Sequence, residues 1–598
     1  MTKKQKTEEE KLYEKVKDLL PTHIVEIELK SDSSQTKEIL NSMEHARLIR
    51  NTALGKMENN YNQMVRTKAY KGLLKKYGKI SETLSKEKDE KQVKILEKEK
   101  NNIQKKLQDM QVKFNVTKKQ AEDLTKKLQK HFSKAQAVIA QTIANGVWDS
   151  IEGLLYRDAK HPKYKDKQRF RSIEGKQNER CIMLKKDEKE RFFLSYLKMN
   201  LPLIVKKDDL FIQETLSNIA YYMDNFKSIN KENIERVERG NSPKSTYRVK
   251  YNRIIKKEIR GKIRLFLQVV LEGVPVPRRK KDGSFRHKEG TGVVAADIGT
   301  QSLAVTTEHE VVLKNLAERT TTSRERELVL LQRKLDRSRR ATNPDCFDKK
   351  GRAIKKMHTK SKRYLKTQKK LRNLHRVLTE NKKYAHREDI NILRSLGDVF
   401  ITEPSNYKAL QKRAKEVTIN EKTGKFNCRK RYGKSILNRS PGYFIQQLKY
   451  RFELSGGTFK EVNGWTFKAS QFDHMSGVNN KKQLSQRWHI FEDGTKVQRD
   501  LYSSFLMYCS NDKGTKPDII SCNENFNHFK LLHNYCVDEM KFHNKEVKNS
   551  GIKMTKGKKK NLIFQEKKKN TFYKQFKKYV MFVLCYEKFF STKALVLN

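Results

Sequence analysis

The sequence predicts a multidomain protein of mixed α and β structure. Its 598 residues are enough for several domains, since one domain commonly takes about 150 residues. Stretches of alternating polar and apolar residues, typical of strands, lie on both sides of a long stretch with helical periodicity. A segment rich in Pro, Gly and charge, residues 274–292, is the clearest domain boundary in the chain.

Before this boundary the sequence predicts strands interrupted by helices. Residues 23–29 alternate in polarity as a strand does, and residues 35–61 favour a helix. In residues 81–132, apolar side chains recur in steps of three, four or seven among Lys, Glu and Gln. This pattern is typical of a long amphipathic helix or a helical hairpin, which would form a solvent-bridging arm or a dimerising coiled coil. The remaining predicted elements are a helix over 133–156 and strand-like texture from residue 172, clearest at 247–251 and 263–271.

After the boundary, two short apolar strands each end in an acid. Residues 293–296 lead into Asp297, and a tight turn at Gly299 then predicts a hairpin with a second strand. Residues 399–402 lead into Glu403, at the carboxyl end of a buried strand, where α/β sheets usually carry their chemistry. Both acids are therefore candidates for a functional site.

A third acid, Asp500, lies at the predicted start of a helix. Leu501, Phe505 and Tyr508 follow it at helical spacing. Negative charge in the first turn of a helix is favoured by the helix dipole, so a cap is one explanation for this residue.

The charge of the chain predicts an anionic partner. Lys and Arg number 132 against 70 Asp and Glu, a formal net charge of +62. Such a field attracts a polyanion, and release of counterions from phosphates would drive binding. The basic helical region at residues 323–396, interrupted by a loop at 339–353, is expected to pack with its apolar stripe and to contact phosphate with its charged face.

The composition argues against a membrane or a secreted protein. The most apolar stretches, residues 266–276 and 579–590, fall short of the roughly 20 residues that a spanning helix needs. Residues 1–15 have no apolar core for a signal peptide, so we expect an intracellular protein, cytoplasmic and nucleoid-associated in a prokaryote or nuclear in a eukaryote. The seven Cys form no Cys-x-x-Cys pair, so neither a disulfide framework nor a zinc site is predicted.

Phosphodiester hydrolysis is the chemistry that three convergent acids suit best. It uses a pair of metal ions about 3.5–4 Å apart, which activate water and stabilise the leaving oxygen. Magnesium prefers carboxylate oxygens and its own waters. Asp297, Glu403 and Asp500 lie far apart in the chain, so only folding could bring them together. Spacing alone leaves ordinary caps and surface acids as the alternative.

The segments around these acids resemble the motifs of a known nuclease family. GVVAADIGTQSLAV resembles the first RuvC motif of the TnpB (OrfB) family of transposon-encoded nucleases, and DVFITEPSNYKAL resembles the second. KVQRDLYSSFLM resembles the third, in which Arg-Asp precedes a helix of small and apolar residues. The same motifs in the same order mark the compact type V CRISPR effectors. YRVKYNRIIKKEIRGKIRLFLQVVLEG and LQRKLDRSRRATNP also look like this group, so the resemblance runs, with gaps, from about residue 23 to residue 510.

This resemblance implies a bilobed α+β protein that cleaves DNA under the direction of a guide RNA. A wedge-like β-barrel and a helical recognition lobe would hold the guide and its heteroduplex with the target. One RuvC domain, an RNase H-like α/β fold, would cut both strands of double-stranded DNA in turn. The implied domains are a discontinuous wedge-like barrel at 1–70 and 172–285, a helical recognition insertion at 71–171, a RuvC-like nuclease domain with a basic helical insertion at 291–510, and a Lys-rich C-terminal region of unknown fold at 511–598.

Carried over position by position, Asp297, Glu403 and Asp500 would be both the catalytic residues and the metal ligands. The resemblance implies two Mg²⁺ ions at these acids, for which Mn²⁺ could substitute. Arg499 would lie beside the site, near substrate phosphate. The other cations expected to contact nucleic acid are Arg487, Arg337, Arg339, Arg340, Lys362 and Arg363.

The chain departs from the family pattern where most members carry a zinc ribbon built from two Cys-x-x-Cys pairs. Here the matching stretch is SQFDHMSGVNNKKQLSQRWHIFEDG. In the alignment with the family, the four ligand positions are occupied by Asp473, Ser476, Ile490 and Asp493. His474 and His489 lie close by, but two histidines without thiolates make a poor zinc site. We therefore expect a metal-free nucleic-acid loop and no zinc.

Other functions stay open from the sequence. A cleavage-inactive RNA-guided DNA-binding repressor would be expected to lack at least one of the acids, and all three are present. A non-guided DNA-binding accessory protein of a transposon is the second alternative. A DDE-type transposase fits less well, because the third acid lies in an Arg-Asp-Leu-Tyr setting. The sequence separates neither a transposon from a CRISPR locus nor a monomer from a dimer, and the Lys-rich residues 553–578 suit either base stacking or a basic tail.

Overall fold

The computed structural model describes residues 8–553, apart from 88, 158, 160, 319–323, 349–350, 355–356, 414–415, 420–431, 484 and 548. The chain forms two compact units, each made of two separate stretches. The first unit holds residues 1–288 and 320–384, and the second holds residues 289–319 and 385–598. The change of unit after residue 288 falls within the linker predicted at 274–292, whereas the domain limit predicted at residue 510 falls inside the second unit.

The first unit contains helices, strands and one short 3-10 helix. Its helices are α1 (Glu8–Leu19), α2 (Ser33–Arg66), α3 (Lys68–Leu84), α4 (Glu90–Lys113), α5 (Lys118–His131), α6 (Ala137–Tyr156), α7 (Leu210–Glu238), α8 (Glu325–Thr342), η2 (Pro344–Cys346) and the larger part of α9 (Lys362–Leu396). Its strands are β1 (Thr22–Leu29), β2 (Ser172–Glu174), β3 (Met183–Lys186), β4 (Phe192–Tyr196), β5 (Met199–Ile204), β6 (Val249–Ile259) and β7 (Lys262–Glu272).

The strands of the first unit form one seven-stranded antiparallel sheet in the order β2-β6-β7-β1-β5-β4-β3. β1, β6 and β7 confirm the strands predicted from alternating polarity. β6 and β7 are joined at Arg260 and Gly261, whose positive φ angles match the two-residue turns that hairpins prefer. Asn252 of β6 donates a hydrogen bond to the carbonyl of Ile182, just ahead of β3 (3.0 Å). Closure of this sheet into a barrel stays a prediction.

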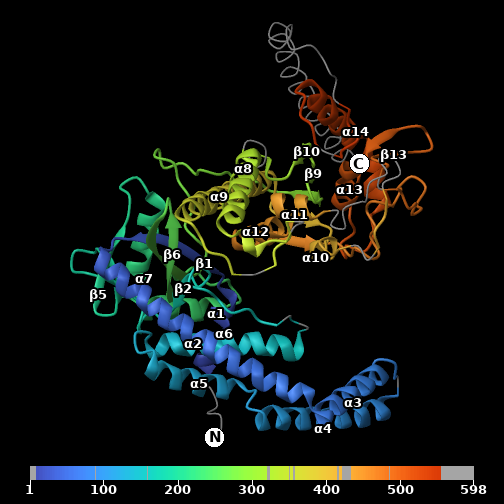
Figure 1. Cartoon of the computed structure of the whole chain (residues 1–598). Helices are drawn as coiled ribbons and strands as arrows, with labels where there is room; N and C mark the ends of the chain where they lie inside the picture. Colours follow the sequence, from blue (N-terminus) through green and yellow to red (C-terminus); the bar gives the residue numbers. More distant parts are fainter. Residues whose placement is uncertain are drawn as a thin grey trace. The chain divides into compact units, whose positions relative to one another are not determined.

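The amphipathic segment predicted at residues 81–132 is not one continuous helix. Asp89 and Thr117 start two separate helices, because their side chains accept hydrogen bonds from the first free amides of α4 and α5. Figure 1 shows α3 and α4 side by side. Leu107 and Ala121 pack with residues of α2 and α6 in one apolar cluster, so part of the apolar stripe is buried within the chain.

The first unit also contains a helix where strand-like texture was expected. α7 lies between β5 and β6, and the Asp209 side chain caps it by accepting from the amide of Ile212 (3.3 Å). Ile212 and Ile219 pack against the sheet core from one helical face. The prediction was wrong here because it assigned strand character to the whole region after residue 172. The segment that forms α7 has helical spacing of its own.

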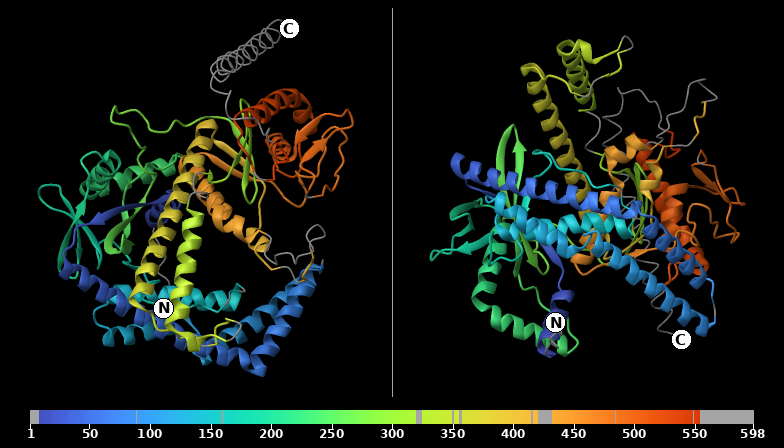
Figure 2. Two further views of the ribbon diagram at one scale, coloured as in Figure 1. Left: turned by 45° about the horizontal axis from the view of Figure 1, so that its top comes forward. Right: turned by 60° about the horizontal axis from the view of Figure 1, so that its bottom comes forward.

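The basic helical region predicted at residues 323–396 is confirmed as α8 and α9, joined by a loop. Figures 1 and 2 show the two helices side by side. Asn343 fixes the loop, because its side chain donates to the carbonyl of Thr359 (3.0 Å) and accepts from the same residue's amide (2.7 Å). The division between the two units falls inside α9.

The second unit contains the end of α9 and the elements on which the three acids lie. Its strands are β8 (Val293–Ile298), β9 (Ser302–Thr307), β10 (Val311–Asn315), β11 (Val399–Thr402), β12 (Thr458–Glu461), β13 (Trp488–Ile490) and β14 (Lys496–Gln498). Its helices include α10 (Tyr407–Leu410), α11 (Gly433–Arg439), α12 (Pro441–Leu454), α13 (Arg499–Tyr508) and α14 (Ile519–Phe542).

A five-stranded mixed sheet forms the centre of the second unit. Its order is β10-β9-β8-β11-β12, with β11 parallel to both β8 and β12, and with β9 and β10 antiparallel. The predicted strands at 293–296 and 399–402 and the predicted hairpin after Asp297 are confirmed. The carboxyl ends of β8, β11 and β12 therefore share one edge of the sheet.

Helices cover both faces of this sheet. Ala295 of β8 and Ile401 of β11 pack into a cluster with α13 and α14. Their neighbours in sequence, Ala296 and Phe400, pack on the other face with α12 and the end of α9. Alternate residues thus face opposite helical layers, which explains why these strands are continuous apolar runs. Within the described residues, no helix has the length and apolar character that crossing a bilayer requires.

Candidate active site

Asp297 and Glu403 leave neighbouring parallel strands at the same level. β8 and β11 pair with Ala296 opposite Thr402, so the next residue on each strand is one of these acids. The Thr402 hydroxyl donates to the carbonyl of Ala296 (2.8 Å), which reinforces the register where the acids begin. The pairing of the strands therefore brings two residues together that are far apart in the sequence.

The two acids also belong to the same face of the sheet. Ala295 and Ile401 both pack toward α13, and strand residues two positions apart share a face. Asp297 and Glu403 stand two positions beyond them. Both carboxylates are thereby directed toward the helical layer that carries the third acid.

Asp500 lies in the first turn of α13, the helix that packs on β8, β9 and β11. Gln498 caps this helix, because its side chain accepts from the amide of Leu501 (2.8 Å). A hydrogen bond between Thr306 of β9 and Ser504 (2.7 Å) ties the helix to the sheet. The helix start predicted at Asp500 is confirmed to within one residue.

The charges of Glu403 and Asp500 reach Asp297. Burial raises the pKa of Asp297 well above its ordinary value, and the negative charges of Asp500 and Glu403 raise it further, while Arg499 opposes them. Burial also raises the pKa of Glu403. The Arg499 guanidinium lies 3.5 Å from the Asp500 carboxylate, and both side chains are largely buried. The charges of Glu403, Asp500 and Arg499 therefore all act on the Asp297 carboxyl.

The donor chemistry of this group fits magnesium. Within the described part of the chain, no three His, Cys, Asp or Glu side chains are close enough to hold one ion together. Magnesium does not require this, because it is usually held by one or two carboxylates and completes its octahedron with water and substrate phosphate. Concentrated negative charge that raises the pKa of Asp297 is the environment that divalent cations relieve.

Two residues that the sequence did not single out shape the surroundings of Glu403. The Tyr407 hydroxyl donates to the carbonyl of Ile298 (2.7 Å) and so ties the loop after β11 to the end of β8. A Cβ built on Gly464 would lie 3.2 Å from Glu403 Oε1, so the loop after β12 lies against the acid. Gly464 could be found only by recognising β12, which the sequence analysis did not predict.

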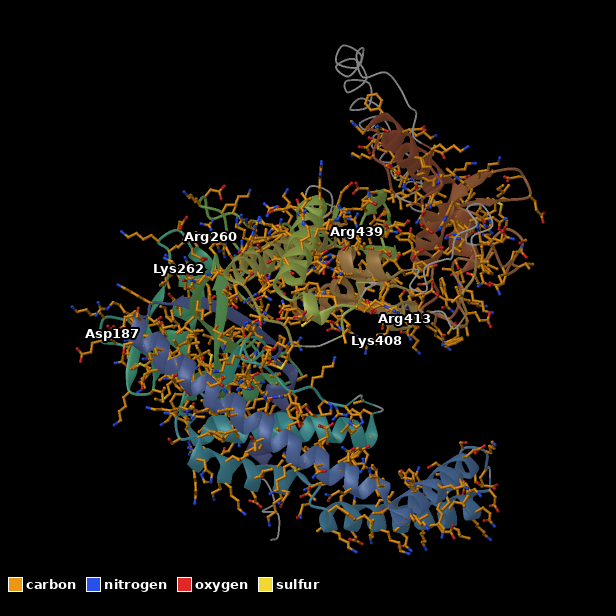
Figure 3. The ribbon with its side chains drawn as sticks, in the orientation of Figure 1. Asp187, Arg260, Lys262, Lys408, Arg413 and Arg439 are labelled. Atoms are coloured by element: carbon orange, nitrogen blue, oxygen red, sulfur yellow. The ribbon has the colours of Figure 1, made fainter. Side chains whose placement is uncertain are left out.

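Exposed cations follow Glu403 along the chain. Lys408 lies on α10, and Lys412 and Arg413 come directly after it, all three exposed. Figure 3 labels Lys408 and Arg413 on this segment. Their position on the loop that leaves the β11 end suits contact with phosphate near the acids.

The stretch aligned with the zinc ribbon folds without thiolate ligands. Asp473 accepts hydrogen bonds from the amides of Met475 (2.9 Å) and Ser476 (3.2 Å), so these ligand positions form a tight turn. Asp493 closes the β13–β14 turn in the same way, by accepting from the amide of Thr495 (2.8 Å). Ile490, the remaining aligned position, is exposed on β13.

The two histidines of this stretch are buried between these turns and α13. His489 Nε2 bonds to Asp473 Oδ2 (2.9 Å), and its Nδ1 contacts the Lys482 ammonium. His474 Nδ1 bonds to the hydroxyl of Tyr502 on α13 (2.7 Å). An Asp–His–Lys chain and a cluster of aromatic rings therefore join the two turns to the helix that carries Asp500.

The remaining predicted nucleic-acid residues are divided between the two units. Arg339 and Arg340 both bond to Asp336 and lie over the Phe347 ring, so they have partners within the loop region. Arg340 is nevertheless exposed, and so are Arg337, Lys362 and Arg363 of the same unit. Arg487 belongs to the second unit, where its carbonyl accepts from the amide of Arg499 (3.0 Å).

Comparison with known proteins gives structural similarities only. No family model matches the chain, and no curated protein matches it. Among solved structures, a Cas12f1–sgRNA–target DNA complex matches 83% of this chain and 99% of its own, with 12% identity and a TM-score of 0.36. A CRISPR-Cas12f ternary complex matches 81% of this chain and 83% of its own, with 12% identity and a TM-score of 0.20. A Cas12i1 R-loop complex before target DNA cleavage matches 86% of this chain and 64% of its own, with 11% identity and a TM-score of 0.26. At TM-scores below 0.5 these similarities do not establish a shared fold.

Proposed function

We propose that this chain is an RNA-guided DNA endonuclease with a single RuvC-type site at Asp297, Glu403 and Asp500. The observation that carries the proposal is the parallel register of β8 and β11, which sets two of the acids side by side on the face covered by α13. The third acid lies in the first turn of that helix. An RNase H-like arrangement of this kind suits hydrolysis of a phosphodiester.

The three carboxylates would hold two Mg²⁺ ions, with Mn²⁺ as a substitute. Bound there, the ions would activate water and neutralise charge on the scissile phosphate. Arg499 would contact that phosphate, because its guanidinium is held beside Asp500 while the Gln486 carbonyl accepts one of its N–H groups (3.1 Å). The exposed Lys408 and Arg413 would bind the flanking phosphates of the strand.

The partners proposed here are a guide RNA and a double-stranded DNA target. A net charge of +62 supplies the attraction to both polyanions. Base pairing with the guide would supply sequence specificity, and the protein would read only a short motif beside the target. The exposed cations of α8 and α9 in the first unit would contact the nucleic-acid backbone. The gene would lie in a transposon or a CRISPR locus.

A cleavage assay tests the proposal. The full chain is purified with RNA expressed from its own locus, and duplex DNA matching the guide is added with magnesium. We expect cleavage by the wild type and none by Asp297→Ala. Glu461→Gln, which removes an exposed carboxylate at the end of β12, is the matched control and is expected to cut normally.

Each other result of this assay overturns part of the proposal. Cleavage that survives Asp297→Ala removes the site assignment. Guide-dependent binding without nicking by the wild type identifies an RNA-guided repressor. Absence of any discrete copurifying RNA identifies a non-guided DNA-binding protein.

A further inference from the structure

Trp465 is an exposed aromatic side chain beside the proposed nuclease site. It is 90% exposed, whereas tryptophan is strongly buried on average. The chain has three tryptophans, and Trp148 and Trp488 are both partly buried. The exposed indole therefore offers a flat aromatic face to a ligand, and its place beside the acids is what points to the kind of ligand.

The loop that carries Trp465 leaves the same sheet edge as the acids. β12 pairs in parallel with β11, with Glu461 opposite Thr402, and the amide of Val462 donates to the carbonyl of Thr402 (3.0 Å). Glu403 and the chain after Val462 therefore emerge next to each other. Gly464, the residue before Trp465, lies against the Glu403 carboxylate.

Hydrogen bonds hold this loop in one shape. Asn463 Oδ1 accepts from the amide of Trp465 (3.1 Å), and the Asn463 carbonyl accepts from the amides of Thr466 (3.1 Å) and Phe467 (2.8 Å). The Asn463 amide donates to the carbonyl of Gly514 (2.8 Å). Phe467 is 1% exposed, so it anchors the loop in the core while Trp465 stays outside.

The chain around this loop carries exposed charges of both signs, with cations in excess. The exposed cations on the loop and on its partner segment at 511–516 are Lys468, Lys513 and Lys516. Glu461 and Asp512 are the exposed acids on the same stretches. A DNA strand, which has phosphates on one side and bases on the other, suits a loop with an exposed indole and exposed lysines on the same stretches better than an apolar protein surface does.

We propose that Trp465 is a stacking platform for an unpaired base of the DNA strand that enters the site. The inference rests on the proposed function, because the strand to be cut is the one that reaches Glu403. Every base has a flat π-face, so an indole holds any unpaired base without reading its identity. A base within an intact duplex is already stacked and paired, so this contact also favours single-stranded over double-stranded substrate.

Fluorescence of the full chain in metal-free buffer tests this inference without cleavage. The emission that differs between the wild type and Trp465→Phe reports on Trp465. We expect oligothymidine to quench it, and an abasic oligonucleotide of the same length and charge to leave it unchanged. A base that stacks on tryptophan contributes enough that Trp465→Ala should weaken oligothymidine binding about 5- to 150-fold. Trp465→Phe should retain most of the affinity.

Tyr221→Ala provides a matched control, because Tyr221 is an aromatic residue 63% exposed on α7 of the first unit. Its affinity for oligothymidine should equal that of the wild type. Equal quenching by the abasic oligonucleotide, or no weakening in Trp465→Ala, would overturn the stacking site. Base-dependent quenching in a protein that cuts no DNA would overturn the nuclease proposal while leaving the stacking site supported.

Discussion

At Asp297, burial and two neighbouring negative charges act against ionisation. A neutral Asn at this position removes the like-charge repulsion and the cost of burying a charge. We therefore predict that Asp297→Asn lowers the cleavage rate at least about a thousandfold. We also predict that it stabilises the metal-free protein at neutral pH. A gain of about 1 kcal/mol would raise the melting temperature by roughly 2–4 °C. Thermal unfolding in EDTA measures this gain.

Asp398→Asn is the control for that comparison. The Asp398 carboxylate accepts from the amide of Gly292 (2.9 Å) at the opposite end of β11. Asn keeps an acceptor oxygen but removes the charge that strengthens this hydrogen bond, so the melting temperature should fall. A melting temperature for Asp297→Asn at or below that of the wild type would show that the acids do not repel one another.

His489 provides a pH prediction. Burial, followed by the charge of Lys482, lowers the pKa of His489 from 6.5 to about 4. Between these pH values His489 is protonated in the unfolded chain but neutral in the folded chain. The free energy of unfolding therefore decreases as the pH falls from 6.5 to about 4. His489→Gln keeps a donor for Asp473 and an acceptor for Lys482 but does not titrate. Its melting temperature should fall less steeply over this range.

The other lowered histidine pKa values, at His23, His474 and His533, remain in the His489→Gln variant. The difference in slope between the two proteins therefore isolates His489. Identical slopes for the wild type and the variant would contradict the buried neutral state.

At the scale of elements, glycines precede the parallel strands β8 and β11, where the two backbones lie very close together. A Cβ on Gly397, just before β11, would lie 2.3 Å from the carbonyl oxygen of Gly292, just before β8. Backbone cannot yield as a side chain does, so Gly397→Ala should destabilise the second unit by several kcal/mol. Gly442→Ala on α12 is the control, because its nearest contact is an ordinary 3.7 Å from Tyr407. An equal fall in the melting temperatures of the two variants would contradict this account.

The sequence predicted the elements whose burial follows a clear pattern, either alternating as in β1 or continuous as in β8 and β11. The apolar runs at 293–296 in β8 and 399–401 in β11 are each followed closely by an acid. Both the strands and the positions of Asp297 and Glu403 could therefore be predicted from the sequence. β12 could not, because three of its four residues are exposed and its register is set only by pairing with β11. The loop with Gly464 and Trp465 was missed for the same reason.

For residues 470–494 the sequence predicted a loop but not the side-chain contacts that it makes. The expectation for this stretch is a metal-free loop for nucleic acid, which stays a prediction. The structure joins Asp473, His489 and Lys482 beneath Tyr502, and side-chain partners of that kind depend on the tertiary fold. The Lys-rich residues 554–578, also singled out from the sequence, lie outside the described residues.

For the whole molecule, charge sets the strength of nucleic-acid binding. Six to ten phosphate contacts would lower the affinity for DNA about 10³- to 10⁵-fold between 50 and 200 mM salt. Filter binding across this range measures the slope. Trp465→Ala should weaken binding at every salt concentration and leave the slope unchanged, because stacking releases no counterions. Affinity that does not depend on salt would contradict a phosphate-driven interaction.

The division into two units was only partly visible in the sequence. The linker at 274–292 marks the first change of unit, because its Pro, Gly and charged residues form no regular element there. The assignment of residues 320–384 to the first unit could not be predicted, since α9 runs unbroken through residue 384 and contains no local signal for that division.

The strand order of the second unit has a consequence for how the protein is made. β11 lies between β8 and β12, and α13 follows both in the chain, so a ribosome releases Asp297 long before its partners exist. Contacts that span so many residues form late and slowly. A nascent or truncated chain ending ahead of α13 would bind nucleic acid through its basic segments but have no complete cutting centre. If the chain is the proposed nuclease, synthesis itself keeps it from cutting until α13 has emerged.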